Sequence, residues 1–246
     1  MDITPRDELS QSTTGMSRVA QPAGVARVRL GAASLVVAGI LFILYPAVRP
    51  FSDEALGQSR SDAALLQAAT AFASPAWLLA HMLGMLGFTL VGLGLLGLHT
   101  ALRETRGEQL VFSALVISWL GIGLTLPYYG AEAFGLHAIG QEALREHNAA
   151  LVNLADVVRG GPELVMFGIG LLLIAVGAIL VAIAIWKSGT FPRWAGVPFA
   201  LGFALYIPQF YGNQPLRVAH GFLVAIGCLW IAASMWRQSS KRAASV

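Results

Sequence analysis

The sequence predicts an all-α fold: a polytopic transmembrane helical bundle of six spans, with a cytoplasmic N-terminus and a cytoplasmic C-terminus. Three observations predict it. Hydrophobic residues make up 56% of the 246 residues and charged residues only 12%, about half the charge of an average soluble domain. The apolar residues fall into six runs, each about as long as a bilayer crossing requires. The basic residues gather in the connections on one side of these runs.

The six apolar runs are bounded by polar or charged residues. They cover residues 30–48, 77–102, 110–134, 164–186, 194–211 and 216–236. The run 194–211 is short and carries Pro198 and Pro208. Since backbone polar groups find no water in the hydrocarbon core, each run is expected to form a helix that satisfies them internally.

Composition divides the chain into three parts. Residues 1–26 are polar and rich in Ser, Thr, Pro and Gly, which predicts a disordered cytoplasmic tail. Residues 27–237 form a single transmembrane helical domain, and residues 238–246 a short basic cytoplasmic tail. The first apolar run begins too far along the chain for a short cleavable signal, so we interpret it as a retained span.

The distribution of Lys and Arg orients the spans, because these residues mark the cytoplasmic side. Eleven lie in segments assigned to the inside: Arg6, Arg18, Arg27, Arg29, Arg103, Arg106, Lys187, Arg193, Arg237, Lys241 and Arg242. Five lie outside: Arg49, Arg60, Arg145, Arg159 and Arg217. The net charge of +3 forms no continuous basic stripe, so nucleic acid is not expected as a partner. The excess of Lys and Arg on one side of the spans predicts a multi-pass protein of the plasma membrane.

Two outer segments carry helical signals of their own. Residues 61–73 begin with a helix-cap pattern and are rich in alanine, and apolar residues recur at helical spacing in residues 141–159. Both patterns suit a helix that lies on the membrane surface or caps the bundle. The alternative is an ordinary solvated connection.

Polar groups from five spans come to one depth, near the outer face. Such groups are costly inside spans and are therefore the default functional candidates. We predict an outward-facing polar pocket formed by His81, Tyr128, Tyr129, Glu132, His137, Glu163, Gln209, Arg217 and His220. Glu132 is expected to pair with Arg217 or a histidine, or to be protonated. Pro127 is expected to kink the third span, because proline removes a backbone hydrogen bond.

Three functions remain open. The first is a non-catalytic membrane protein that acts through packing, partner binding or sensing. The second is a metal- or haem-binding protein or enzyme, with His81, Glu132 and His220 as ligand candidates, because imidazole and carboxylate suit zinc and iron. The third is a small-molecule or ion transporter. The sequence requires no cofactor. The expected partners are the lipid bilayer and a protein partner or a second copy of the chain, and the ligand is unknown.

The connection between the fourth and fifth runs has the sequence Trp186-Lys-Ser-Gly-Thr-Phe-Pro-Arg-Trp-Ala-Gly196. It resembles a loop in a broad group of uncharacterised bacterial polytopic membrane proteins of about six spans, and the general plan is similar over residues 28–236. The resemblance implies a bacterial inner-membrane location and no assigned activity. The sequence carries no His-Glu-x-x-His, Gly-x-Ser-x-Gly or Walker-type motif.

Overall fold

The computed structural model describes residues 6–50 and 61–244, with side chains from Gly24 onward. Helices make up nearly all of that part of the chain, which contains no strand, and this confirms the all-α prediction. The elements in order are α1 (Arg6–Val48), α2 (Asp62–Ala73), α3 (Pro75–Ala101), α4 (Glu108–Gly130), η1 (Ala131–Gly135), α5 (Leu136–Arg145), η2 (Ala149–Asn153), α6 (Leu154–Arg159), α7 (Gly161–Ser188), α8 (Val197–Ala204), η3 (Pro208–Tyr211) and α9 (Gln214–Ala244).

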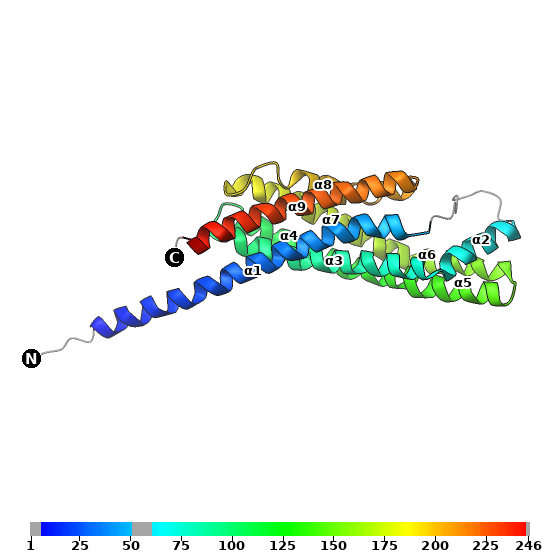
Figure 1. Ribbon diagram of the computed structural model, residues 1–246, viewed down its shortest axis with the longest axis horizontal. Coiled ribbons are helices and arrows are strands. Elements are labelled where there is room, and N and C mark those ends of the chain that lie inside the picture. Colours follow the sequence, from blue (N-terminus) through cyan, green and yellow to red (C-terminus); the bar gives the residue numbers. More distant parts are fainter. Residues whose placement is uncertain (1–5, 51–60, 245–246) are drawn as a thin grey trace, which may run out of the picture.

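The helices form an elongated bundle with two unlike ends (Figure 1). At the first, the terminal end, the two chain termini lie toward the same side, and α3 ends and α4 begins. At the second, the projecting end, α1 ends and α9 begins, and α2, α5 and α6 extend beyond them. The long helices α1, α3, α4 and α7 therefore alternate in direction between the two ends, and α9 runs in the same direction as α7.

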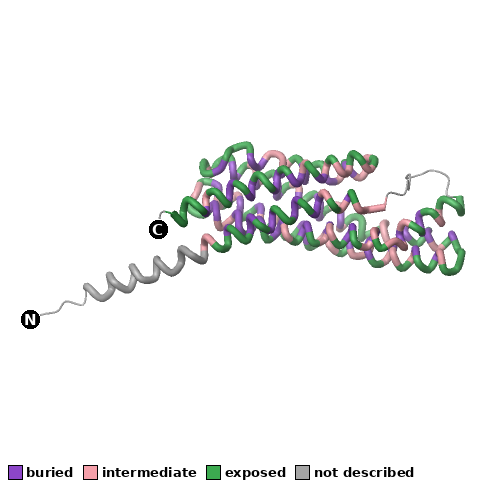
Figure 2. The backbone as a smooth tube through the Cα atoms, in the orientation of Figure 1, coloured by how far each residue is buried: buried purple, intermediate pink, exposed green. Residues whose placement is uncertain are grey.

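Five helices of the described chain are long and apolar enough to cross a membrane: Gly24–Val48, Pro75–Ala101, Glu108–Arg145, Gly161–Ser188 and Gln214–Ala244. Large apolar side chains such as Leu86, Val176 and Phe222 are exposed on the outside of the bundle. Figure 2 shows the same arrangement along the helices, with buried residues between them and exposed residues facing outward. An apolar exterior of this extent indicates a multi-pass membrane protein.

The predicted fifth span, residues 194–211, is not a single long helix. Its α-helical part, α8, has only 8 residues and is followed by turns and the 3-10 helix η3. Pro198 lies in the first turn of α8, where proline is tolerated, and Pro208 begins η3. A proline has no N–H to donate, so one continuous α-helix through both positions would lack backbone hydrogen bonds.

Small residues set the closest helix contacts, as expected where lipid supplies no hydrophobic drive between helices. A Cβ on Gly97 of α3 would lie 2.6 Å from the Cα of Gly31 of α1. A Cβ on Gly121 of α4 would lie 2.6 Å from the Gly170 carbonyl oxygen of α7. The pairs α1–α3, α1–α9 and α4–α7 form the most extensive packing in the bundle.

The projecting end is a helical unit with its own core. The helix predicted in residues 61–73 is present as α2 with Ser61 as its N-cap, and it packs against other helices instead of forming a solvated connection. The helix Glu108–Arg145 is 38 residues long, about 57 Å at 1.5 Å per residue, whereas the hydrocarbon core is about 30 Å thick. Its last part, α5, packs against α2 and η2. Ala69, Phe72 and Leu136 lie in the core between them. Residues 141–159 are not one helix, because α5 ends at Arg145 and the chain turns before η2.

The described backbone of both predicted tails is helical. The backbone of residues 6–26 is helical and continuous with the first span, whereas residues 1–5 of the predicted disordered tail lie outside the described residues. Extending an existing helix avoids the costly step of nucleating one. At the other terminus, α9 continues to Ala244. Within the predicted basic tail, Gln238 and Arg242 donate hydrogen bonds to the Ala101 carbonyl, 3.2 and 3.4 Å away.

The Gly31–Gly97 contact generates a stability prediction. Gly97→Ala forces α1 and α3 apart, and such overpacking costs about 1–3 kcal/mol, so we expect a lower midpoint of thermal unfolding in detergent. Gly168→Ala is the matched control, because nothing lies within 4 Å of a Cβ at Gly168. Its midpoint should stay the same or rise, and equal losses in both variants would contradict the close contact.

Candidate functional site

Trp77 lies where the bundle meets the projecting end. Ser74 caps the N-terminus of α3 by accepting a hydrogen bond from the backbone N–H of Trp77 at 3.2 Å. The Trp77 side chain is fully buried, and its indole N–H donates to the carbonyl of Glu132 at 2.8 Å. This bond ties the start of α3 to the middle of the long helix Glu108–Arg145. The indole ring is therefore fixed in place, and charged side chains from other elements pack against it.

Glu132 reaches the interior through an irregular turn. Between α4 and α5 the chain forms a π-helical turn, η1, one turn after Pro127. Such turns are rare and occur often at functional sites. The side chain of Glu132 is 10% exposed, and it accepts two hydrogen bonds from Arg159: Nε to Oε1 at 2.6 Å and Nη2 to Oε2 at 3.2 Å. A two-point pair of this kind is the strong form of a carboxylate–guanidinium contact.

His81 completes a group of ionisable side chains that we name the ionic cluster: His81, Glu132 and Arg159. The Nδ1 atom of His81 lies 2.7 Å from the carbonyl oxygen of Trp77. Because a carbonyl oxygen can only accept, Nδ1 carries a hydrogen. The other ring nitrogen, Nε2, lies 3.6 Å from Oε2 of Glu132. The imidazole ring is therefore held between the Trp77 carbonyl and the Glu132 carboxylate.

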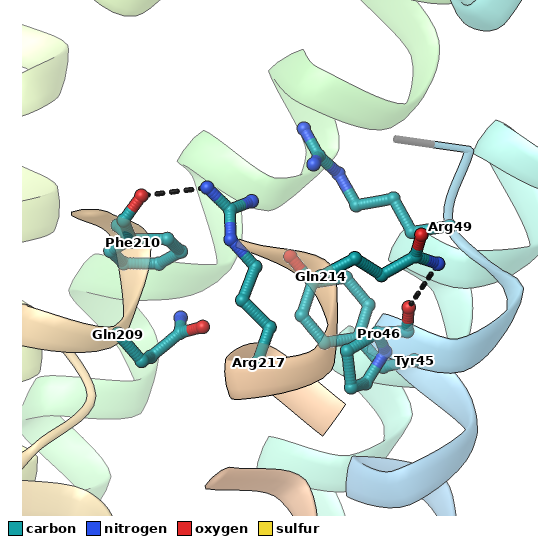
Figure 3. Close-up of a pocket in the computed structure, with 7 residues that line it drawn as sticks. All are labelled: Tyr45, Pro46, Arg49, Gln209, Phe210, Gln214 and Arg217. Carbon is teal, nitrogen blue, oxygen red and sulfur yellow. Dashed lines mark hydrogen bonds between the residues drawn. The ribbon is translucent and has the colours of Figure 1, made fainter. Parts of the chain in front are cut away.

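A pocket opens beside this cluster, between the end of α1, η3 and the start of α9 (Figure 3). Its volume is about 280 Å³ with the open mouth included, and we name it the arginine pocket. The lining residues are Tyr45, Pro46, Arg49, Gln209, Phe210, Gln214 and Arg217. A second hollow of about 220 Å³ shares four of these residues and continues toward His220. The pocket is thus built from three elements that meet only in the tertiary structure.

Aromatic side chains join the pocket to the ionic cluster. The guanidinium carbon of Arg49 lies 4.5 Å from the ring centroid of Trp77, within the range of a cation–π contact. Tyr45 packs edge-on against His81, with ring centroids 5.8 Å apart. Tyr45 also contacts Tyr129, whose hydroxyl lies 2.8 Å from the hydroxyl of Tyr206. The pocket and the cluster therefore share one wall.

The structure brings together some of the predicted site residues. His81 and Glu132 lie in the ionic cluster, and Gln209 and Arg217 line the arginine pocket. Tyr129 lies in the aromatic wall between them. Glu132 pairs with Arg159 and His81 and not with Arg217, so only the histidine part of that prediction is confirmed.

Other predicted residues lie apart from this site. Tyr128 stacks on Phe167, with centroids 4.2 Å apart, and Glu163 is exposed in the first turn of α7. His137 contacts the carbonyl of Phe72 in the projecting end through Nδ1 at 2.9 Å. The place of these groups depends on how each helix is rotated, which their depth in the membrane does not reveal.

The predicted metal or haem ligands His81, Glu132 and His220 do not form one site. His220 contacts the carbonyl of Gly202 through Nε2 at 2.7 Å, and it lines the second hollow instead. Within residues 24–50 and 61–244, no three His, Cys, Asp or Glu side chains are placed to hold a metal ion. Backbone carbonyls hold both histidines, and the His220 ring contacts α8, so the three side chains do not gather as one three-ligand metal site.

Sequence reasoning missed Tyr45, Arg49, Arg159 and Gln214. Arg49 and Arg159 were assigned to outer connections, whereas Arg49 lies over Trp77 and Arg159 inserts between Glu132 and the Phe72 ring. A signal was available for Arg159, because Leu151, Leu154 and Val158 recur just before it at helical spacing. A basic residue next to such an apolar face is placed to reach a buried acid.

Comparison of the chain with protein-family models, with curated proteins and with solved structures gave no match. The resemblance of the loop 186–196 to uncharacterised bacterial membrane proteins therefore stays a prediction.

Two arginine–glutamate pairs of this protein allow a matched test of the ionic cluster. Arg159→Ala leaves the buried Glu132 carboxylate without its main partner, which typically costs about 3–5 kcal/mol. We expect the lower part of this range, because the Arg159 side chain is 25% exposed. Arg145→Ala is the control, since Arg145 pairs with Glu142 on the surface with 67% and 47% side-chain exposure. It should leave stability nearly unchanged.

Denaturant unfolding in detergent measures both variants. Equal free energies of unfolding for Arg159→Ala and the unaltered chain would show that the Glu132–Arg159 pair contributes nothing to the fold.

Proposed function

We propose that this chain is a six-crossing protein of the plasma membrane with both termini in the cytoplasm, and that it binds a ligand or a protein partner at its outer end without catalysis. The observation that carries the proposal is the position of the arginine pocket. It lies at the projecting end, where α1 ends and α9 begins, directly beside the buried ionic cluster.

Contacts of residues 189–213 support a sixth crossing made by an irregular segment. A Cβ on Gly196 would lie 2.6 Å from the Cα of Ala182, in the later half of α7. The Phe210 ring lies 5.9 Å from the Phe167 ring, near the start of α7. The segment therefore runs back along α7 from the terminal end to the projecting end, and α8 packs against both α7 and α9. This return path gives an even number of crossings.

The basic residues support a cytoplasmic terminal end. Arg29 lies over the Trp236 ring at 5.5 Å, and Arg193 lies over the Trp186 and Trp194 rings at 5.3 and 5.8 Å. Arginine and tryptophan together are typical of a membrane interface, where an amphipathic ring sits at the headgroup level. With the terminal end inside, the projecting end and the arginine pocket face outward.

The arrangement of polar groups favours binding over chemistry. The described groups nearest the pocket already bond to protein: His81 and His220 to backbone carbonyls, and Glu132 to Arg159. Paired groups of this kind hold a shape, whereas a nucleophile or general base needs a free position toward its substrate. A preformed polar pocket suits recognition of a ligand or a partner from outside the cell.

The topology predicts which positions an impermeant thiol reagent reaches in intact cells. In a Cys228→Ala background, which removes the only cysteine, the exposed positions Ala150, Thr190 and Asn213 are changed to cysteine one at a time. Ala150→Cys and Asn213→Cys should be labelled from outside, and Thr190→Cys only after permeabilisation. Labelling of Thr190→Cys and Asn213→Cys from the same side would reduce the count to five crossings.

The pocket itself should be reached from outside. Gln214→Cys places a thiol in the lining of the pocket at the start of α9. Gln238→Cys is its matched control, because Gln238 is also half-buried and lies on the same helix at the terminal end. We expect labelling of Gln214→Cys in intact cells and of Gln238→Cys only in permeabilised cells. The reverse result would contradict the outward-facing site.

A further inference from the structure

The lining of the arginine pocket is rich in hydrogen-bond donors. Two of the seven lining residues are arginines and two are glutamines, and no Asp or Glu belongs to the lining that the structure describes. Figure 3 shows the guanidinium groups of Arg49 and Arg217 at the same edge of the pocket. A guanidinium group carries a fork of N–H donors that matches the oxygens of phosphate or carboxylate. The lining therefore favours a ligand that brings acceptor oxygens and negative charge.

Arg217 is fixed by the turn that precedes α9. Its Nη2 donates to the carbonyl of Phe210 at 2.6 Å and its Nε to the carbonyl of Gly212 at 3.0 Å. Asn213 caps α9, since its side-chain oxygen accepts the backbone N–H of Leu216 at 3.1 Å. These bonds hold the guanidinium group in position before any ligand arrives, which lowers the entropy cost of binding.

One N–H donor of Arg49 lacks a hydrogen-bond acceptor. Its Nε atom is buried and has no hydrogen-bond partner within the described chain. A buried N–H group without a partner is rare, and leaving it unsatisfied costs about 1–3 kcal/mol. The guanidinium group packs against the Trp77 ring, with its carbon atom 4.5 Å from the ring centroid. An oxygen atom that enters the pocket can satisfy this N–H, and the aromatic ring holds the group in place for it.

The size and position of the pocket further restrict which ligands can bind. The volume of about 280 Å³ counts the open mouth of the pocket, and its enclosed part is small, so a small polar group fits it better than a drug-sized molecule. The pocket lies at the end of the apolar span Gly24–Val48, where a span meets the polar headgroup region in the proposed topology. A single headgroup-sized anion fits both facts.

We propose that the arginine pocket binds a phosphate group through Arg49 and Arg217, carried either by an anionic phospholipid headgroup or by a free phosphate. The inference rests on the proposed function, because the pocket has to open at the outer face to receive the ligand. Gln209 and Gln214 supply further polar contacts at the sides of the site.

Isothermal titration calorimetry on the full chain tests the proposal, in a neutral detergent and a phosphate-free buffer at constant ionic strength. The two ligands are inorganic phosphate and dihexanoyl phosphatidylglycerol below its micelle concentration. Binding of only the lipid identifies a headgroup as the source, binding of only inorganic phosphate identifies a free phosphate, and binding of both shows that the phosphate group alone is recognised. Absence of binding by either ligand overturns the proposal.

Substitutions locate the binding. Arg49→Gln removes charge-assisted hydrogen bonds, each of which typically contributes enough to change Kd about tenfold or more, so we expect Kd to rise at least about tenfold. Arg49→Lys keeps the charge but loses the fork and should bind more weakly than arginine. It tests the site even where Arg49→Gln elutes as an aggregate in gel filtration.

Arg145→Gln is the matched control, because Arg145 is an exposed arginine of the same outer end that lies outside the pocket. Its Kd should be unchanged, and a loss as large as that of Arg49→Gln would mean non-specific attraction and overturn the site. If Gln214→Cys is labelled from outside but neither ligand binds, the phosphate inference fails and the proposed function stands. If Gln214→Cys is not labelled from outside, the proposed function itself fails.

Discussion

The buried pair of Glu132 and Arg159 is the interaction on which the projecting end of the structure depends. A carboxylate that is only 10% exposed has lost most of its water, and without a cation that loss would be costly. Arg159 comes from α6, 27 residues later in the chain, and its two hydrogen bonds hold the end of α6 against the π-helical turn. The projecting end is therefore attached to the bundle by charge as well as by the apolar core around Phe72 and Leu136.

Trp77 connects the Glu132–Arg159 pair to the arginine pocket. Arg49 lies 4.5 Å and Arg159 5.9 Å from the centroid of its ring, and its indole N–H bonds to the Glu132 backbone. Two cations thus share one aromatic ring, and one carboxylate lies beside it. Arg49, one of these two cations, also lines the arginine pocket, so the ring links the pocket to the ionic cluster.

The remainder of the bundle is organised differently. Its buried hydroxyl groups bond within their own helices, as Thr125 does to the Gly121 carbonyl at 2.8 Å and Ser234 to the Trp230 carbonyl at 2.9 Å. Close contacts between glycines bring the helices together, and dispersion forces hold them. This part acts as a scaffold, and the polar side chains of the arginine pocket lie at the projecting end.

Whether a run of residues favours lipid or water depends on the run itself, so the sequence determined the all-α class and the positions of the long apolar helices. It also placed His81, Glu132, Gln209 and Arg217 toward one end of the bundle. An apolar run in lipid must form a helix whatever surrounds it. Only the tertiary structure decided which polar groups meet. The π-helical turn aims Glu132 at Arg159, backbone carbonyls hold both histidines, and Arg49 joins Arg217 across three elements. Such pairings depend on the rotation and packing of helices far apart in the chain, which no local pattern records.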